Sequence, residues 1–242
     1  MNKDLIRSRF EKSIKTYDEN AKVQNQMAEK LVSLIDKDLY EDVLEIGCGT
    51  GILTKKIINK IQYRNYTAND IVPSCEKYIM EIDKSIAFVG TDIEECLAET
   101  NNKYDLIISN ASIQWVKDFE QFLKTLISRL KPNGILLFST FGQENFREIR
   151  LISEKTLKYY SKNELENILK PNLFTIEEEI RILSFKTPKD VLKHIKYTGV
   201  NAIENTSWTK GDLIRFENAY NNFCSNRPTL TYNPIYAKVL NG

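Results

Sequence analysis

The feature that most restricts the fold of this chain is a glycine-rich turn between a short apolar strand and a helix. Residues 42–46 (Asp-Val-Leu-Glu-Ile) are apolar and β-leaning, Gly47, Gly49 and Gly51 follow, and residues 52–61 have the apolar spacing of a helix. Glycines without Cβ atoms let the backbone turn sharply and pass close to a ligand. A strand that enters a helix in this way is typical of an α/β protein with a ligand site at the carboxyl end of the strand.

Strands and helices continue to alternate after this turn, which predicts the fold class. Strand-like segments are expected at residues 42–46, 63–69, 86–89, 104–110 and 135–140. Helical patterns follow the first, second and fourth of these segments, so we predict an α/β fold with a doubly wound, mostly parallel sheet of seven strands, Rossmann-like in class. After residue 141 the alternation breaks down. Helices are expected at 145–159, 162–169, 188–197 and 209–224, and strands at 175–185 and 230–240.

The same patterns suggest how the chain is organised. Helices at residues 3–16 and 20–36 precede the first strand, so residues 1–38 are predicted to cover the ligand site. Residues 39–242 then form the main domain, with helical lid insertions at about 144–172 and 186–229. We expect these insertions to sit on the edge of the sheet rather than to form a separate domain.

Histidine and cysteine usage excludes several kinds of chemistry. His194 is the single histidine of the 242 residues, so a histidine-rich metal site is excluded and a Ser-His-Asp triad would have to use this residue. The four cysteines form no CxxC pair, which argues against a zinc site or a disulfide framework. No metal is expected. The polar N-terminus and the short longest apolar run, residues 135–138, predict a cytoplasmic protein without a membrane segment.

Charge is distributed unevenly along the chain. Residues 1–144 carry 19 Lys/Arg and 22 Asp/Glu, whereas residues 145–242 carry 15 and 11. The C-terminal part is therefore mildly basic. Exposure to solvent is enough to account for any single lysine in this part. A more specific interpretation is that the lysines together form a binding face for an acidic partner. Nucleic acid is not expected, because clustered arginines are absent from the sequence.

Acidic residues at the ends of three strands indicate the kind of ligand. Ile52 stands where a dinucleotide fingerprint would have glycine or alanine, and Glu45 just before the turn would repel phosphate but attract an ammonium or sulfonium group. Asp70 ends the second strand, where a carboxylate can accept both hydroxyls of a ribose. Asp92 follows the third strand and is suited to an adenine amino group, with Ile93 packing on the ring.

These residues resemble a known family over about residues 40–140. The sequence LEIGCGTG, the strand end at Asp70, the pair Asp92-Ile93 and the segment YDLIISNASIQWV are similar to class I S-adenosylmethionine-dependent methyltransferases. The resemblance implies S-adenosylmethionine as cofactor. The cofactor-binding residues that it implies are Glu45, Gly47, Gly49, Gly51, Asp70, Ile71, Asp92, Ile93, Asn110 and Ala111.

Flanking segments narrow the resemblance. Residues 9–24, 109–115, 137–149, 194–202 and 230–236, taken in this order, resemble the malonyl-acyl carrier protein O-methyltransferases of biotin synthesis. The segment between residues 141 and 161 is shorter than the matching segment of many family members. The roles of lid residues in the family are therefore poorly assigned to positions in this segment. The implied reaction is methyl transfer from the sulfonium to the free carboxylate of a malonyl thioester. A carboxylate is already ionised at neutral pH, so no general base is required.

Candidate residues for this reaction come from the edge of the predicted sheet. Arg147 follows the fifth strand and is the first choice to anchor the carboxylate, and Tyr17 in the N-terminal helices is the second. Each has a simpler interpretation, as a surface arginine and as a packing residue. Gln114, Trp115, Tyr159 and His194 are predicted substrate contacts, although core packing is an alternative role for the aromatic residues and for His194.

The resemblance also implies a protein partner. Acyl carrier proteins are acidic, and the basic half offers a landing face formed by Lys155, Lys158, Lys162, Lys186, Lys189, Lys193, Lys196, Arg215 and Arg227. We expect the enzyme to be a monomer. The sequence leaves open whether malonyl is carried by acyl carrier protein or coenzyme A. Two alternatives remain, a methyltransferase for a small carboxylate or quinone-type carbon and a non-catalytic S-adenosylmethionine-binding protein.

Overall fold

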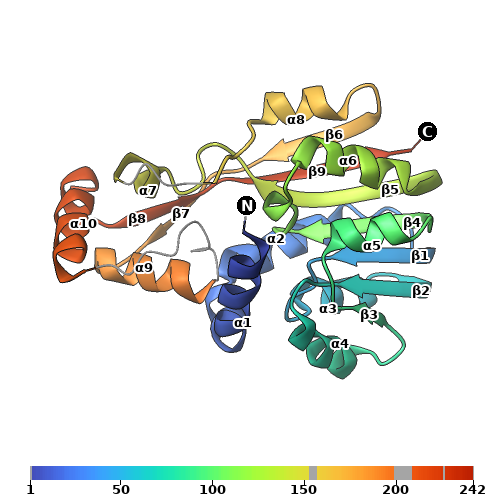
Figure 1. The fold of residues 1–242 in the computed structure, drawn as a ribbon. Coiled ribbons are helices and arrows are strands. Elements are labelled where there is room, and N and C mark those ends of the chain that lie inside the picture. The colour runs from blue at the N-terminus through green and yellow to red at the C-terminus, as the bar shows by residue number, and fades with distance from the viewer. Residues whose placement is uncertain (1, 153–156, 199–208, 226, 242) are drawn as a thin grey trace.

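The chain forms a seven-stranded sheet with helices between its strands, as the alternation of strand and helix patterns in the sequence predicts. The computed structural model describes residues 2–152, 157–198, 209–225 and 227–241. The strand order is β3-β2-β1-β4-β5-β9-β6, and neighbours pair in parallel except for β9, which is antiparallel to β5 and β6 (Figure 1). The strands are β1 Leu39–Ile46, β2 Gln62–Asn69, β3 Ala87–Val89, β4 Tyr104–Asn110, β5 Leu130–Phe141, β6 Leu173–Glu178 and β9 Pro234–Leu240.

Helices cover both faces of this sheet, so its central strands are buried on both sides. On one face α2 (Lys22–Ser33), α3 (Ile52–Ile58) and α4 (Glu76–Ile82) surround one apolar cluster. On the other, α5 (Ile93–Glu99), α6 (Phe119–Ser128) and α8 (Lys162–Leu169) surround a second cluster. The run Ile135–Phe138 in β5 is fully buried, as expected for a central strand.

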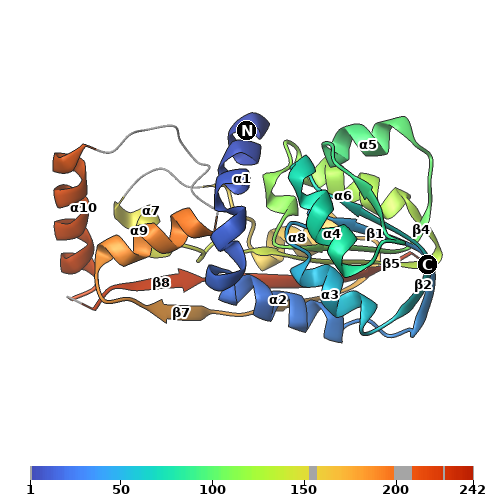
Figure 2. The ribbon, with the colours of Figure 1, turned by 90° about the horizontal axis from the view of Figure 1, so that it is seen from below.

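A second group of elements extends the molecule beyond the carboxyl ends of the parallel strands. A two-stranded antiparallel sheet of β7 (Arg181–Ser184) and β8 (Thr229–Tyr232) lies beside α9 (Pro188–Tyr197) and α10 (Lys210–Phe223) (Figure 2). With α7 (Arg147–Ile152) they enclose a third apolar cluster, to which Val23 and Met27 of α2 also belong. The predicted division into domains and lid insertions remains a prediction.

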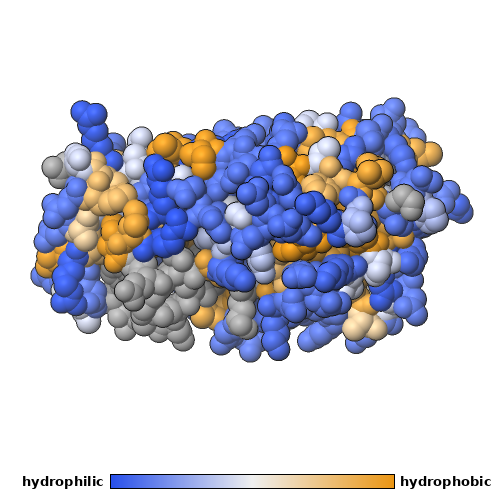
Figure 3. Space-filling view, turned by 90° about the horizontal axis from the view of Figure 1, so that it is seen from above, coloured by the Kyte–Doolittle hydropathy of each residue, from blue (hydrophilic) through white to orange (hydrophobic). Residues whose placement is uncertain are grey.

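The N-terminal helix α1 (Lys3–Asn20) stands between this second group and the main sheet (Figure 1). Asn2 caps it by accepting a hydrogen bond from Leu5 N at 3.0 Å. Within the described parts of the chain, no helix is both long and apolar enough to cross a bilayer. Figure 3 shows a largely hydrophilic face with several apolar patches, one of them at the end where α7 and α10 lie. Both helices expose a large apolar residue, Leu151 in α7 and Ile214 in α10.

Several predicted boundaries were wrong. The expected strand 175–185 is two strands, β6 and β7, which belong to different sheets. The expected strand 230–240 is likewise divided into β8 and β9 at Asn233. β5 begins at Leu130 rather than 135, and a register shift opposite Tyr104 and Leu106 accommodates the longer strand.

Helix boundaries also differ from the prediction. The expected helix 145–159 is helical only over Arg147–Ile152, and residues 153–156 lie outside the described part. The helix α5 was not predicted, although Asp92 caps it by accepting a hydrogen bond from Glu94 N at 2.8 Å and two glutamates follow in its first turn. Short 3₁₀ turns at Pro73–Cys75 and Ile113–Trp115 complete the connections.

Candidate functional site

The glycine turn forms the floor of a cavity at the carboxyl edge of the sheet. Gly47, Gly49 and Gly51 have φ values of +69°, +54° and +79°, a region that favours glycine. Gly47 N donates to Asn69 O at 2.8 Å, which ties the turn to the end of β2. A Cβ at Gly47 would lie 2.0 Å from Ser112 Oγ, so the close approach of the segment after β4 requires glycine at this position.

Asp70 lies in this cavity at the end of β2. Its Oδ2 accepts a hydrogen bond from Gly49 N and its Oδ1 one from Val72 N, both at 2.9 Å. Burial raises the pKa of Asp70, and the two backbone hydrogen bonds act against that rise. Ile71 beside it also lines the cavity. The carboxyl group is therefore fixed in orientation in the cavity, and its contact with a ribose stays a prediction.

Asp92 and Ile93 form the neighbouring wall, and a lysine from α1 closes it. Lys3 Nζ lies 2.5 Å from Asp92 Oδ2 and 2.6 Å from Glu94 Oε2. All four residues line the cavity. This contact links the N-terminal helix to the edge of the main sheet, and the covering of the ligand by the first helices stays a prediction.

The exit of β4 supplies the opposite side of the cavity. Asn110 Nδ2 donates to Gln24 O at 3.0 Å, and Asn110 Oδ1 accepts from Ser139 Oγ at 2.7 Å. Ala111 has a positive φ of 51°, which turns the chain sharply after the strand. Gln114 Nε2 donates to Ala111 O at 2.7 Å, whereas Gln114 Oε1 is buried without a partner among the described residues.

Tyr17 and Trp115 also face this space. Tyr17 comes from α1 and packs edge-on against Phe10 with ring centroids 5.1 Å apart. Burial raises the pKa of its hydroxyl above the ordinary value, and the charges of Asp18 and Asp70 add to the effect. The hydroxyl is therefore protonated at neutral pH and available as a donor. Trp115 lines the cavity from the 3₁₀ turn after β4.

Glu45, in contrast, lies behind the turn and does not line the cavity. Side chains alternate along β1, so Ile46 faces the cavity side and Glu45 the opposite face. Glu45 Oε2 accepts hydrogen bonds from Thr54 Oγ1 at 2.7 Å and Tyr66 OH at 2.5 Å, and Oε1 has no partner among the described residues. Burial raises the pKa of Glu45 to about 7. The structure thus places Glu45 behind the turn and outside the cavity lining, and its predicted contact with a ligand stays a prediction.

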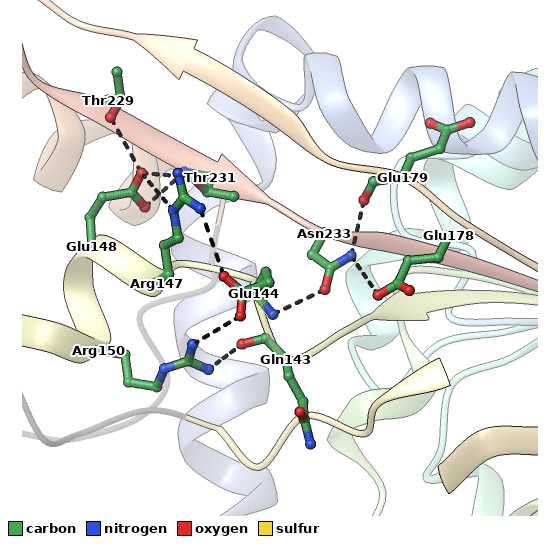
Figure 4. A network of polar contacts seen from close by, with 10 residues as sticks. All are labelled: Gln143, Glu144, Arg147, Glu148, Arg150, Glu178, Glu179, Thr229, Thr231 and Asn233. Carbon is green, nitrogen blue, oxygen red and sulfur yellow. Dashed lines mark hydrogen bonds and ion pairs between the residues drawn. The ribbon is translucent and has the colours of Figure 1, made fainter. Parts of the chain in front are cut away.

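Arg147 also lies outside the cavity lining, although it was the first choice for the carboxylate anchor. It begins α7, and its guanidinium lies 3.8 Å from Glu144 Oε2 and 3.9 Å from Glu148 Oε1 (Figure 4). Glu148 is 1% exposed and accepts hydrogen bonds from Thr231 N and Thr231 Oγ1 at 2.9 and 2.7 Å. This network joins α7 to β8 and holds Arg147 among carboxylates.

Tyr159 and His194 belong to the third apolar cluster and its border, not to the cavity lining. Tyr159 is buried, and its pKa is raised to about 12 mainly by that burial. His194 on α9 has its Nε2 2.8 Å from Tyr232 OH. Part of the predicted segment 194–202 and Lys155 lie outside the described residues.

Sequence reasoning missed several cavity residues. Lys3, Phe10, Gln24, Ser112, Phe141 and Thr198 line the space as well. Phe10 and Gln24 lie in residues 9–24, one of the segments on which the family resemblance rests. Their place in this segment is the sequence signal that could have indicated a role at the site. Thr198 follows α9, far from β1 in the sequence, so no local pattern indicates its contact with the cavity.

Comparison with known proteins agrees with this architecture. A family model described as a methyltransferase domain matches residues 17–179. A putative methyltransferase from Bacillus halodurans has a similar fold, with a TM-score of 0.65 at 13% identity over 89% of this chain and 99% of that one. The N-methyltransferase NodS from Bradyrhizobium japonicum, solved with S-adenosyl-L-homocysteine, has a TM-score of 0.50 at 16% identity over 92% and 87%. The fold and site thus define a class I methyltransferase.

Full-length relatives identify the family within this class. A malonyl-[acyl-carrier protein] O-methyltransferase from Calditerrivibrio nitroreducens is 40% identical over 95% of this chain and 94% of its own length. One from Porphyromonas gingivalis is 36% identical over 96% and 94%. This chain belongs to the malonyl-[acyl-carrier protein] O-methyltransferase family.

Proposed function

We propose that this protein transfers a methyl group from S-adenosylmethionine to the free carboxylate of malonyl-acyl carrier protein. The observation that carries the proposal is one cavity in which the glycine turn, Asp70, Asp92 and the exit of β4 meet, in a chain that matches the family over nearly its whole length. The product is a methyl ester that starts pimeloyl and biotin synthesis.

The cavity residues fit the cofactor. Asp70 offers a fixed carboxylate for ribose hydroxyls, Asp92 a carboxylate for the adenine amino group, and Ile93 an apolar wall. Gln24 Oε1 and Gln114 Oε1 are buried acceptors without protein partners in the described structure, which suits a ligand that carries N–H groups. When bound, S-adenosylmethionine supplies a methyl group on a sulfonium centre that is open to nucleophilic attack.

The protein's task is then orientation rather than proton transfer. A malonyl carboxylate is ionised at neutral pH, so the site needs a donor to hold it and a wall to exclude water. Of the two residues predicted to be catalytic, Tyr17 is the one that lines the cavity, and its neutral hydroxyl can donate to a carboxylate oxygen. Trp115 and Gln114 are proposed as the substrate wall.

The proposal does not rest on Arg147, Tyr159 or His194. They lie outside the cavity lining, and Arg147 is held near Glu144 and Glu148. We therefore assign the carboxylate anchor to Tyr17 first, with Arg147, the residue that the sequence favours, as the alternative.

The acyl carrier protein is proposed to land on α9. Lys189, Lys193 and Lys196 recur at positions i, i+4 and i+7, so they share one exposed face of this helix. Lys189 pairs with Glu217 of α10 at 3.0 Å. The C-cap of α9 is Thr198, which lines the cavity, so this basic face leads toward the candidate site.

One assay tests the reaction. The purified protein is incubated with S-adenosylmethionine and malonyl-acyl carrier protein, and mass spectrometry follows the gain of one methyl group on the malonyl carrier. Acetyl-acyl carrier protein lacks the free carboxylate and should remain unchanged. Cofactor binding without any methylated malonyl product would overturn the proposal.

The same assay separates the competing functions. Malonyl-coenzyme A tests whether a carrier protein is required, and free malonate tests a small-molecule carboxylate methyltransferase. Equal turnover of free malonate and the carrier-bound substrate would favour the small-molecule enzyme. Tight binding of S-adenosylmethionine with no turnover of any of these substrates would favour a binding protein.

A further inference from the structure

A series of hydrogen bonds leads from the core of the sheet to the cavity through the exit of β4. Ser139 of β5 is fully buried, and its Oγ donates to Asn110 Oδ1 at 2.7 Å and accepts from Ala111 N at 3.0 Å. Ala111 O in turn accepts from Gln114 Nε2 at 2.7 Å. Asn110, Ala111 and Gln114 line the cavity, so the series starts in the core and ends at the space for a ligand.

Backbone groups fix the direction of each hydrogen bond in this series. A backbone N–H only donates, so Ser139 Oγ accepts from Ala111 N and its single hydrogen goes to Asn110 Oδ1. Asn110 Nδ2 then donates to the backbone oxygen of Gln24 at 3.0 Å. The backbone oxygen of Ala111 only accepts, so the nitrogen of the Gln114 amide faces it. The amide oxygen of Gln114 is therefore turned away from Ala111.

The short segment that carries Gln114 is held in place by its surroundings. Ala111 has a φ of +51°, which is uncommon for a residue with a Cβ and persists where neighbouring groups hold the chain. Ile113 is fully buried in one of the apolar clusters. Ser112 lies so close to Gly47 that a Cβ on the glycine would be 2.0 Å from its Oγ. Core packing, the glycine turn and the bond to Ala111 therefore fix the position of the Gln114 side chain.

The oxygen of the Gln114 amide is left for a ligand. Oε1 is buried, and no protein group in the described parts of the chain bonds to it. A buried acceptor without a donor costs free energy, so its partner is a hydrogen-bond donor of a ligand. The malonyl carboxylate has no hydrogen to donate at neutral pH and cannot be this partner. Ribose hydroxyls have Asp70 as their proposed acceptor, so the remaining donors are N–H groups.

We propose that Gln114 Oε1 accepts a hydrogen bond from an N–H group of a ligand in the cavity, and that Ser139 holds Gln114 in the orientation that this requires. Gln114 is then a binding residue. Ser139 is a positioning residue that acts through Asn110 and Ala111. Two sources offer such an N–H group, the amino groups of S-adenosylmethionine and the amides of the phosphopantetheine arm. The second source rests on the proposed function, whereas the first requires only that the protein binds its cofactor.

Hydrogen exchange of the Gln114 amide tests the orientation before any ligand is added. In protein labelled with ¹⁵N in glutamine side chains, the signals of Gln114 are those that disappear in Gln114→Met. One hydrogen of this amide should exchange slowly with solvent because Ala111 O holds it, and Ser139→Ala should accelerate the exchange. Ser109→Ala is the matched control, since Ser109 is also fully buried but its Oγ donates to Ile46 O at 2.9 Å. Rapid exchange of both hydrogens in wild type would overturn the proposed orientation.

Binding of S-adenosyl-L-homocysteine tests the cofactor as the source. Calorimetry compares wild type, Gln114→Met and Gln121→Met, a matched control at an exposed position of α6. If the donor is an amino group of the cofactor, Gln114→Met weakens binding about tenfold, the order of one buried hydrogen bond, and Gln121→Met leaves it unchanged. S-inosyl-L-homocysteine lacks the adenine amino group, and the deaminated analogue lacks the ammonium group. The analogue without the donor should bind wild type and Gln114→Met equally, which identifies the group.

Substrate kinetics test the phosphopantetheine arm as the source. If the donor is an arm amide, binding of S-adenosyl-L-homocysteine stays constant in Gln114→Met. The KM for malonyl-acyl carrier protein then rises about tenfold, while the KM for a malonyl thioester of a simple alkyl thiol does not change. Wild-type values for Gln114→Met in both measurements would overturn the proposal. Failure of the proposed function is a different result, in which no malonyl substrate is methylated although amide exchange and cofactor binding are as expected.

A double-mutant cycle separates positioning by Ser139 from a general effect on stability. Ser139→Ala should weaken the same ligand as Gln114→Met, but it should add little in the Gln114→Met background because Ser139 acts through Gln114. Ser109→Ala should leave the affinity for that ligand unchanged. Ser139→Ala by itself serves as the test if the Gln114 variant folds poorly, since unchanged ligand affinity in Ser139→Ala would overturn the positioning role. Fully additive effects in the cycle would also overturn it.

Discussion

The buried surroundings of Glu45 make the stability of the folded protein depend on pH. It is fully buried behind the glycine turn, and its pKa is raised from 4.5 to about 7 by burial. A carboxyl group that holds its proton more tightly in the folded state favours folding at low pH and opposes it once deprotonated. The cost is absent below pH 4.5, grows as the pH rises and is complete above about pH 7.

Glu45→Gln should therefore stabilise the protein at pH 8 by about 3 kcal/mol, the free energy that corresponds to this pKa shift, with little effect near pH 4.5. Urea unfolding at a series of pH values measures the difference. Glu41→Gln is the matched control, because Glu41 is an exposed glutamate of the same strand. A stability difference that does not change with pH would contradict the prediction.

Tyr17 is the residue on which the proposed chemistry depends most. If its hydroxyl holds the malonyl carboxylate, Tyr17→Phe should lower kcat/KM by about 10- to 100-fold, since a hydrogen bond to a charged group contributes about 1.5–3 kcal/mol. The Kd for S-adenosyl-L-homocysteine should change less than the kinetic constants. Tyr104→Phe, at the opposite edge of the sheet where β4 begins, should have wild-type activity. Equal activity of the two variants would remove Tyr17 from the mechanism.

At the scale of elements, the connection between β8 and β9 decides how the two sheets are joined. Asn233 is fully buried there, and its Nδ2 donates to Glu178 Oε1 and Glu179 O, both at 3.0 Å. Its Oδ1 accepts from Glu144 N at 3.0 Å (Figure 4). One side chain thus satisfies backbone groups of the segments that follow β5 and β6.

Asn233→Ala should leave these buried groups without partners and destabilise the protein by about 2–4 kcal/mol. The free energy of unfolding in urea measures the loss. Asn163→Ala on the exposed surface of α8 should change stability by less than about 0.5 kcal/mol. If the two variants are equally stable, the side chain of Asn233 does not hold the junction.

At the scale of the whole molecule, charge is arranged with respect to the cavity. The exposed lysines of α9 lie on the side of the molecule beyond the carboxyl ends of the parallel strands, and Lys60 and Lys84 precede β2 and β3 at the opposite edge of the sheet (Figure 1). An acidic carrier protein that lands on α9 would be attracted by the lysines of α9 and little affected by Lys60 and Lys84.

Reversing Lys193 and Lys196 to glutamate should raise the KM for malonyl-acyl carrier protein several-fold at low ionic strength. The effect should fade with added salt, because exposed charges are screened over about 8–10 Å near physiological ionic strength. The KM for malonyl-coenzyme A should change less. Lys60→Glu combined with Lys84→Glu makes the same change in net charge and should leave the carrier KM constant. An equal rise in both double variants would show a net-charge effect rather than a docking face.

The sequence by itself determined the parallel sheet and the cofactor edge of the site. The glycine turn, Asp70, Asp92 and Asn110 follow local patterns, because each is fixed by its distance from the end of a strand. The same spacing could not place Glu45, since one position along a strand moves a side chain to the other face of the sheet. Fold class and family, which rest on many such local signals, were predicted and confirmed.

Only the tertiary structure decided which distant residues meet. The division of the last strand at Asn233, the pairing of Arg147 with Glu144 and Glu148, and the contact between His194 and Tyr232 join elements far apart in the sequence. Such contacts depend on how helices pack beyond the sheet, and residue spacing carries no information about that packing. For this reason the cofactor residues could be read from the chain, whereas the substrate side of the cavity required the folded molecule.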